Sequence, residues 1–215
     1  MIMLGSILLG SASCGPDASL IHAAKGGHQT TAQLMLTLGA DINAQDSYNP
    51  YGHTPLIWAV RFRNLEMVKW LLSKGADING RDYYNQTPLI VAATWPGSPE
   101  IIEYLVSNHA DLEAKDIRGR TALMHAASDP EHAGSMKILL ANGADIRAMD
   151  IFRNTVLYYA LTSYASRDCR IQKAGLLVAA GADPTDTTWL EQTTNMTSQE
   201  RQELVEWLKH AQANK

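Results

Sequence analysis

The sequence has few of the features that mark several common protein classes. Cysteine occurs only twice, at Cys14 and Cys169, so disulfide bonds do not supply a framework for the fold. No run of 18 apolar residues occurs, and no segment therefore reads as a regular membrane-spanning helix. Lys and Arg form no runs and the net charge is −4, which argues against DNA or RNA as the partner.

Signatures of catalysis are also missing. There is no glycine-rich phosphate loop and no G-x-S-x-G nucleophile turn. The histidines show no metal-ligand spacing, and many of the aspartates recur periodically, as turn residues do. We therefore expect a protein that is not an enzyme and that holds neither a cofactor nor a metal.

The first 14 residues differ from the rest of the chain. Residues 1–9 are mostly apolar, and small residues follow them up to Cys14. This order resembles a bacterial lipoprotein signal, in which Cys14 would become the lipidated first residue of a periplasmic or membrane-anchored protein. No Lys or Arg precedes the apolar run, and Ser11 stands where such signals usually carry an aliphatic residue. The alternative is an uncleaved N-terminal segment on a cytoplasmic protein.

Two landmarks recur along the chain with one period. The alanine of an Ala-Asp pair lies at positions 40, 76, 110, 144 and 182, at spacings of 36, 34, 34 and 38 residues. A Thr-x-Leu triplet begins independently at positions 54, 87, 121 and 155, at spacings of 33, 34 and 34 residues. A shared period in two landmarks predicts an array of about five structural repeats, with a partial first copy at residues 20–24.

Each landmark has a physical role in a pair of helices. Thr followed by Pro starts a helix, because the hydroxyl accepts from an unpaired N–H and proline already has a helical φ. The second helix has apolar residues three and four apart, as at Leu65, Val68 and Leu71, and a glycine that can adopt the left-handed conformation follows most of these helices. Each hairpin turn begins at an aspartate, namely Asp46, Asp82, Asp116 or Asp150.

These motifs closely resemble the ankyrin repeat family. Residues 75–79 read Gly-Ala-Asp-Ile-Asn, and residues 116–127 nearly match the second half of the repeat signature, with the motif histidine displaced by one to His125. The resemblance covers about residues 18–185. It implies an all-α solenoid of helix-turn-helix repeats with short hairpins, in which His22 and His125 are partly buried structural residues. It also implies a scaffold that binds other proteins, without naming the partner.

Some positions depart from the repeat pattern. His109 replaces the glycine that ends a helix, and the hairpin around residues 48–51 is three residues longer than the others. After residue 184 the period stops, residues 197–200 have the composition of a capping box, and Leu204, Trp207 and Leu208 follow at helical spacing. We expect a signal segment at 1–14, a repeat array at 15–185 and a C-terminal cap at 186–215, which covers the end of the stack.

The residues that do not repeat indicate a binding surface. By the family's register, the hairpin tips and first helices form a concave face that is rich in Tyr, Trp and Arg, the residue types that dominate binding hot spots. The predicted partner-binding residues are Tyr48, Tyr51, Arg61, Phe62, Tyr83, Tyr84, Trp95, Arg118, Arg120 and Phe152, with His53 and Arg153 beside them. Trp58 and Trp70 are assigned to the core instead.

We therefore expect a monomer that binds a partner protein on this face. In the periplasm it would suit two roles, as an immunity protein that neutralises a toxin or as an accessory protein that holds an enzyme. The alternative is a cytosolic adaptor. A membrane would be contacted only through the lipid on Cys14.

Overall fold

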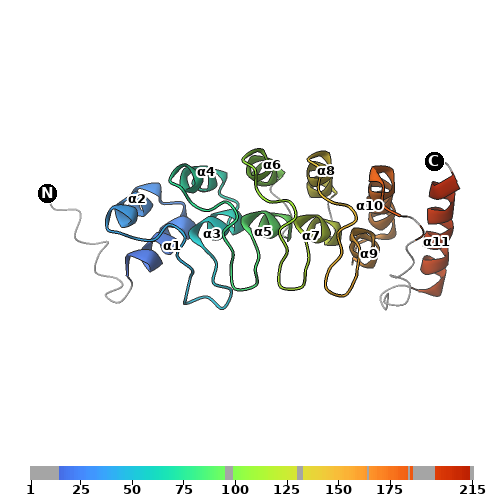
Figure 1. The fold of residues 1–215 in the computed structure, drawn as a ribbon, viewed down its shortest axis with the longest axis horizontal. Helices are drawn as coiled ribbons and strands as arrows, with labels where there is room; N and C mark the ends of the chain where they lie inside the picture. Colours follow the sequence, from blue (N-terminus) through green and yellow to red (C-terminus); the bar gives the residue numbers. More distant parts are fainter. Residues whose placement is uncertain are drawn as a thin grey trace. The chain divides into compact units, whose positions relative to one another are not determined.

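A computed structural model describes residues 15–94, 99–129, 133–163, 165–183, 185 and 197–213 (Figure 1). The regular elements of these residues are all α-helices, and one isolated antiparallel bridge joins Met149 to Thr155. The all-α prediction is therefore confirmed. No helix within these ranges has the length and apolar character needed to cross a membrane. The chain divides into two compact units, residues 1–83 and 84–215.

The first unit contains two helix pairs. Its helices are α1 (Pro16–Gly26), α2 (Gln29–Thr37), α3 (Pro55–Arg61) and α4 (Leu65–Ser73). Helix α1 packs against both α2 and α3, and α3 packs against α4. The first helix of one pair therefore lies beside the first helix of the next, and the hairpin loop extends away from them (Figure 1).

The second unit repeats this arrangement. Its helices are α5 (Pro88–Thr94), α6 (Pro99–Ser107), α7 (Ala122–Ser128), α8 (Gly134–Ala141), α9 (Val156–Thr162), α10 (Arg167–Ala180) and α11 (Ser198–Ala213). The first helices α5, α7 and α9 pack side by side in one layer, and α6 and α8 pack together in another. Helix α10 packs against α9, and α11 packs against α10.

Threonine hydroxyls start three of the first helices as predicted. Each accepts a hydrogen bond of 3.3 Å from the backbone N–H three residues later, and the three are Thr54, Thr87 and Thr155. Thr121 differs, because its buried hydroxyl has no hydrogen-bond partner among the described residues. The fourth first-helix start therefore lacks the side-chain cap.

Every second helix ends in the same way. The N–H of the recurring alanine donates to the carbonyl five residues earlier, at distances from 2.9 Å for Ala182 to 3.1 Å for Ala76 and Ala144. The residue before each alanine has a positive φ, which glycine adopts at little cost. His109 takes this position in the third repeat with a φ of 64°, so its backbone follows the repeat even without glycine.

The core follows the repeat as well. The leucine after each Thr-Pro or Thr-x position is buried, as are the apolar residues of the second helices that face it; these leucines are Leu56, Leu89, Leu123 and Leu157, and Leu20 of α1 is buried too. Trp58 is buried as predicted. Trp70 is only half-buried, so its assignment to the core was wrong: its ring lies at the edge of α4, where Lys74 covers it.

A buried lysine joins the last repeat to the one before it. Lys173 on α10 is fully buried, and its Nζ donates to the carbonyl of Ala127 at 3.1 Å and to that of Asp129. Burial lowers the pKa of Lys173. Both carbonyls lie at the C-terminal end of α7, where backbone acceptors have no partner within the helix. Lys173 supplies the donor that they need.

Helix α11 begins with the predicted capping box. Thr197 Oγ1 accepts from the Glu200 N–H at 3.2 Å, and Glu200 Oε2 accepts from the Thr197 N–H at 2.7 Å. Leu204 and Leu208 are buried, and the half-buried Trp207 ring lies against Gly175 of α10. The predicted apolar stripe of this helix therefore faces the last repeat.

Candidate partner-binding surface

The two residues after each turn aspartate form an exposed hairpin tip. The aspartate carboxylate accepts from the N–H two residues later, at 3.1 Å for Tyr48, 2.8 Å for Arg118 and 2.8 Å for Phe152. This bond draws the carboxylate inward, and the tip side chains point to solvent. The tip pairs are Ser47 and Tyr48, Tyr83 and Tyr84, Ile117 and Arg118, and Ile151 and Phe152.

Backbone hydrogen bonds join neighbouring hairpins within each unit. In the first unit, the Tyr83 N–H donates to the Tyr51 carbonyl at 2.9 Å. In the second unit, the Ile117 N–H donates to Tyr84 and the Ile151 N–H donates to Arg118, both at 3.0 Å. The hairpins therefore present their tip side chains from backbones that neighbouring hairpins hold in place.

An aromatic cluster lies beneath the tips of the first unit, formed by Tyr51, His53, Trp58 and Phe62. Tyr51 stacks on His53 at 5.3 Å between ring centroids, His53 meets Trp58 edge to face at 4.9 Å, and Phe62 stacks on Trp58 at 5.7 Å. The two inner rings are buried, while Tyr51 and Phe62 are exposed. The buried rings thus support the exposed ones.

Two cations flank this aromatic cluster. Lys25 Nζ lies 4.0 Å from the centre of the Trp58 ring and 2.8 Å from Asp46 Oδ2. The Arg61 guanidinium lies 5.8 Å from the Tyr51 ring and 5.7 Å from the Trp58 ring, within the range of cation–π attraction. Both cations are therefore held against aromatic faces.

The imidazole of His53 connects Arg61 to a buried carboxylate. His53 Nε2 lies 3.2 Å from Arg61 Nη1, and Nδ1 lies 3.1 Å from Asp82 Oδ2. Because a guanidinium can only donate, Nε2 accepts and Nδ1–H donates to Asp82. The pairing fixes the tautomer of His53 and orients Arg61.

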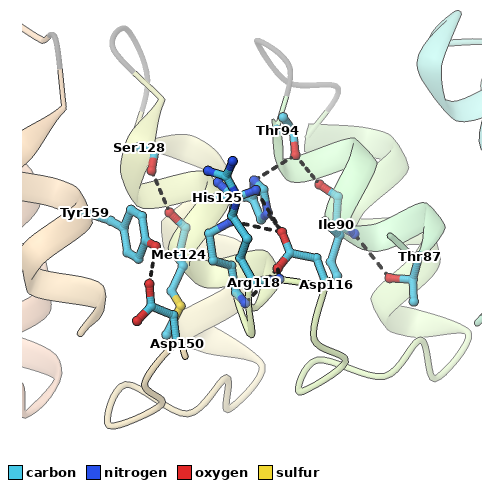
Figure 2. Close-up of polar contacts among 11 residues, drawn as sticks. Thr87, Ile90, Thr94, Asp116, Arg118, Met124, His125, Ser128, Asp150 and Tyr159 are labelled. Carbon is cyan, nitrogen blue, oxygen red and sulfur yellow. Dashed lines mark hydrogen bonds and ion pairs between the residues drawn. The ribbon is translucent and has the colours of Figure 1, made fainter. Parts of the chain in front are cut away.

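In the second unit, Asp116 is the acceptor for a whole group of donors (Figure 2). Its carboxylate accepts from the backbone N–H groups of Arg118 and Arg120 at 2.8 and 2.9 Å, from the Arg120 guanidinium at 2.9 and 2.8 Å, and from His125 Nε2 at 3.0 Å. Burial raises the pKa of Asp116, but the bonds from His125 and Arg120 outweigh it and hold that pKa well below its usual range. Asp116 is thus a stable anion.

The other side of the His125 ring meets Thr94, whose hydroxyl oxygen lies 3.1 Å from Nδ1 (Figure 2). Burial lowers the pKa of His125, although the hydrogen bond to Asp116 opposes this shift. Nε2–H donates to Asp116, and the Thr94 hydroxyl beside Nδ1 donates its own proton to the Ile90 carbonyl at 2.8 Å. The prediction of a buried structural histidine is confirmed for His125, whereas His22 is exposed.

Asp150 has the same role in the next repeat with a different donor. It accepts from the Tyr159 hydroxyl at 2.6 Å, from the Phe152 and Asn154 N–H groups at 2.8 Å, and from Asn154 Nδ2 at 3.0 Å. Burial and the bond to Asp150 raise the pKa of Tyr159. The phenol therefore remains a donor.

Comparison with protein-family models identifies this repeated architecture. A model of three ankyrin repeat copies matches residues 20–116, and a model of a single ankyrin repeat matches residues 118–151. The chain belongs to the ankyrin repeat family. Ankyrin repeats are protein–protein interaction scaffolds, and proteins built from them are generally not enzymes. No curated protein matches the chain.

The family matches end at residue 151, but the ankyrin geometry continues through α9 and α10.

The displaced motif histidine also gains a structural explanation. The fourth residue after the helix-starting threonine is Trp58, His125 or Tyr159, and each donates to the turn aspartate of its own repeat. In the third repeat this position is Val91, which has no donor, and Asp82 accepts from His53 instead.

Most of the predicted partner-binding residues lie on the hairpin side of the ankyrin repeats. Tyr48 is 78% exposed and Phe152 65%. The others with exposed side chains are Tyr51, Phe62, Tyr83, Tyr84, Arg118 and Arg153, and Arg61 is half-buried. Trp95 lies outside the described residues, as does Cys14, the predicted lipidation site.

Two of the predicted residues serve the interior instead. His53 is 1% exposed, so it supports the surface from below through Asp82 and Arg61. Arg120 is a quarter exposed and uses its guanidinium on Asp116. Both side chains are used in the interior for the same reason, since a buried turn carboxylate requires a nearby donor.

Sequence reasoning missed the aliphatic part of the surface. Ile117 and Ile151 are exposed at the tips, next to Arg118 and Phe152. Their signal was present, since both directly follow a turn aspartate, as Tyr83 does. Lys25 was also missed, because its partners Asp46 and Trp58 belong to the following repeat. The described residues contain no cluster of three or more His, Cys, Asp or Glu suited to a metal ion.

Proposed function

We propose that the hairpin side of these ankyrin repeats docks a partner protein. The observation that carries the proposal is the series of exposed aromatic, aliphatic and arginine side chains at successive hairpin tips, on hairpins whose backbones are hydrogen-bonded to their neighbours within each unit. Aromatic residues and arginine are enriched at binding hot spots, and an ordered surface loses little entropy on binding. Tip side chains presented in this way suit a folded partner.

The proposed setting is the bacterial periplasm, with the protein anchored through lipid on Cys14. The support is the order of apolar residues, small residues and Cys14 in the sequence. The missing Lys or Arg before the apolar run favours the second candidate, a cytosolic adaptor. Intact-mass analysis of membrane-fraction protein from the native host distinguishes the two: the first requires a mature chain that begins at an acylated Cys14, and an unmodified chain from Met1 refutes it.

Two roles fit a periplasmic binder of this kind. As an immunity protein it would block the activity of a toxin, whereas as an accessory protein it would leave its enzyme active. Assaying the purified partner with and without an equimolar amount of this protein separates the roles, because only an immunity protein abolishes the partner's activity.

Site-specific photocrosslinking tests the docking surface itself. A photoreactive amino acid at position 152 replaces an exposed tip residue, and the same amino acid at position 137 replaces Lys137, an exposed residue of the second helix α8. In the native host, position 152 should give one discrete adduct that mass spectrometry identifies. An adduct from position 137 with none from position 152 would contradict the proposal.

A further inference from the structure

The tips of the second unit indicate the chemistry of the partner. We infer that the partner presents an acidic segment with apolar side chains to the tip row, which we define as Tyr84, Ile117, Arg118, Ile151, Phe152 and Arg153. The inference rests on the proposed function, and it adds what the docked surface of the partner carries.

The tip row combines apolar area with positive charge. Its four apolar and aromatic side chains are between 40% and 65% exposed. Both arginines are exposed too, and neither guanidinium forms an ion pair with a carboxylate of the described residues. Arginine combines a planar pair of donors with a weakly hydrated charge, so it suits a carboxylate at an interface.

The carboxylates of the same hairpin tips are withdrawn from the surface. Asp116 and Asp150 are buried, and each accepts several hydrogen bonds from its own repeat. The exposed acids of these hairpins come earlier in the loop, where each accepts a backbone N–H; they are Asp111, Glu113 and Asp145. The charge that the tips expose to a partner is therefore positive.

This local sign is opposite to that of the whole chain, whose net charge is −4. Complementary potentials at an interface guide association and select partners, so a positive row favours an acidic partner. Nucleic acid fits less well. Its binding depends on neutralising many phosphates with Lys and Arg, whereas this row has only two arginines and no lysine among four apolar or aromatic side chains.

The test uses short random peptides displayed on phage and selected on the purified full chain. Three proteins are compared: the wild type, the double variant R118E/R153E, and the double variant K137E/K209E. Lys137 on α8 and Lys209 on α11 are exposed residues outside the tip row, so the control changes the net charge equally. Thermal unfolding and circular dichroism verify that all three fold alike.

We expect the wild type and the K137E/K209E control to enrich peptides with Asp or Glu beside apolar residues. On R118E/R153E, synthetic copies of these peptides should bind about tenfold more weakly, and selection should shift to peptides with Lys or Arg. Peptides enriched without excess acidic residues, or an equal loss in both double variants, would overturn the inference. So would tighter binding of single-stranded DNA or anionic lipid vesicles than of the selected peptides.

Failure here is distinguishable from failure of the proposed function. If no peptide is enriched, the acidic-segment inference is wrong, while crosslinking from position 152 still tests docking of a folded partner. If acidic peptides bind but Phe152→Ser and Ile151→Ser leave their affinity unchanged, only the apolar part of the inference is wrong.

Discussion

At the scale of single residues, each repeat from the second onward keeps a buried turn aspartate and changes its donor. Asp46 has Lys25 and Trp58, Asp116 has Arg120 and His125, and Asp150 has Asn154 and Tyr159. An unpaired buried carboxylate would be costly, so each repeat needs some donor, but several residue types can supply it. These variable donors lie directly under the variable tips.

The His125–Asp116 pair makes stability depend on pH. Burial holds the pKa of folded His125 below its usual value of 6.5, so below pH 6.5 the unfolded chain binds a proton that the folded chain does not. The contribution of the buried, neutral His125 to the free energy of unfolding is complete above pH 6.5 and is lost as the pH falls. His125→Gln should flatten the loss of unfolding free energy between about pH 6.5 and pH 5, as measured by urea denaturation.

The exposed His22 of α1 gives the matched control. His22→Gln should keep the wild-type pH dependence in that range. If His125→Gln retains the full wild-type slope, the folded imidazole is protonated and donates from both of its nitrogens.

At the scale of elements, the hairpins depend on close backbone contact between tips. Gly119 has a φ of 76°, and a β-carbon there would lie 2.9 Å from the Ile151 backbone nitrogen. Gly119→Ala should therefore lower the free energy of unfolding by about 1–3 kcal/mol, through a strained backbone and a weakened bond between Ile151 and Arg118. Urea denaturation measures the change.

Gly134, the first residue of α8, is the matched glycine, because a β-carbon there meets nothing within 4 Å. Gly134→Ala should leave stability unchanged or raise it by up to about 1 kcal/mol, because alanine favours the helix. Equal effects of the two substitutions would show that contact between tips contributes nothing to stability.

Helix α11 should stabilise the last repeat through Trp207. The ring lies against Gly175 but is only half-buried, so Trp207→Ala should cost about 2–3 kcal/mol, less than a fully buried tryptophan. Gln202→Ala, at an exposed position of the same helix, should cost less than about 0.5 kcal/mol. An unchanged unfolding midpoint for Trp207→Ala would show that the helix does not support the repeats.

The helices themselves could be predicted from sequence because the repeat signals are local. Threonine caps, the glycines after the second helices and the capping box at Thr197 each act within a few residues of the chain. The partner-binding surface was harder to predict from sequence, because the contacts that shape it join residues of different repeats. Nothing within the segment around His53 indicates that Asp82 lies beside it, and the burial of His53 follows from that contact.

At the scale of the molecule, different residues of each repeat stabilise the fold and form the binding surface. The leucines and second-helix apolar residues hold the stack, and the turn carboxylates and their donors hold the hairpins. The tip side chains are then free to vary, since they contribute little to the stack or to the hairpin backbone. The division predicts that tip substitutions change binding while the fold stays intact.

Calorimetric titration of the crosslinked partner, once purified, tests this claim most directly. Tyr84→Ala, Arg118→Ala and Phe152→Ala should each lose about 1–4 kcal/mol of binding free energy, with unfolding free energies within about 0.5 kcal/mol of wild type. Lys137→Ala on α8 should change neither quantity. The account is contradicted if all three tip variants bind like the wild type, or if their loss of affinity comes only with early unfolding.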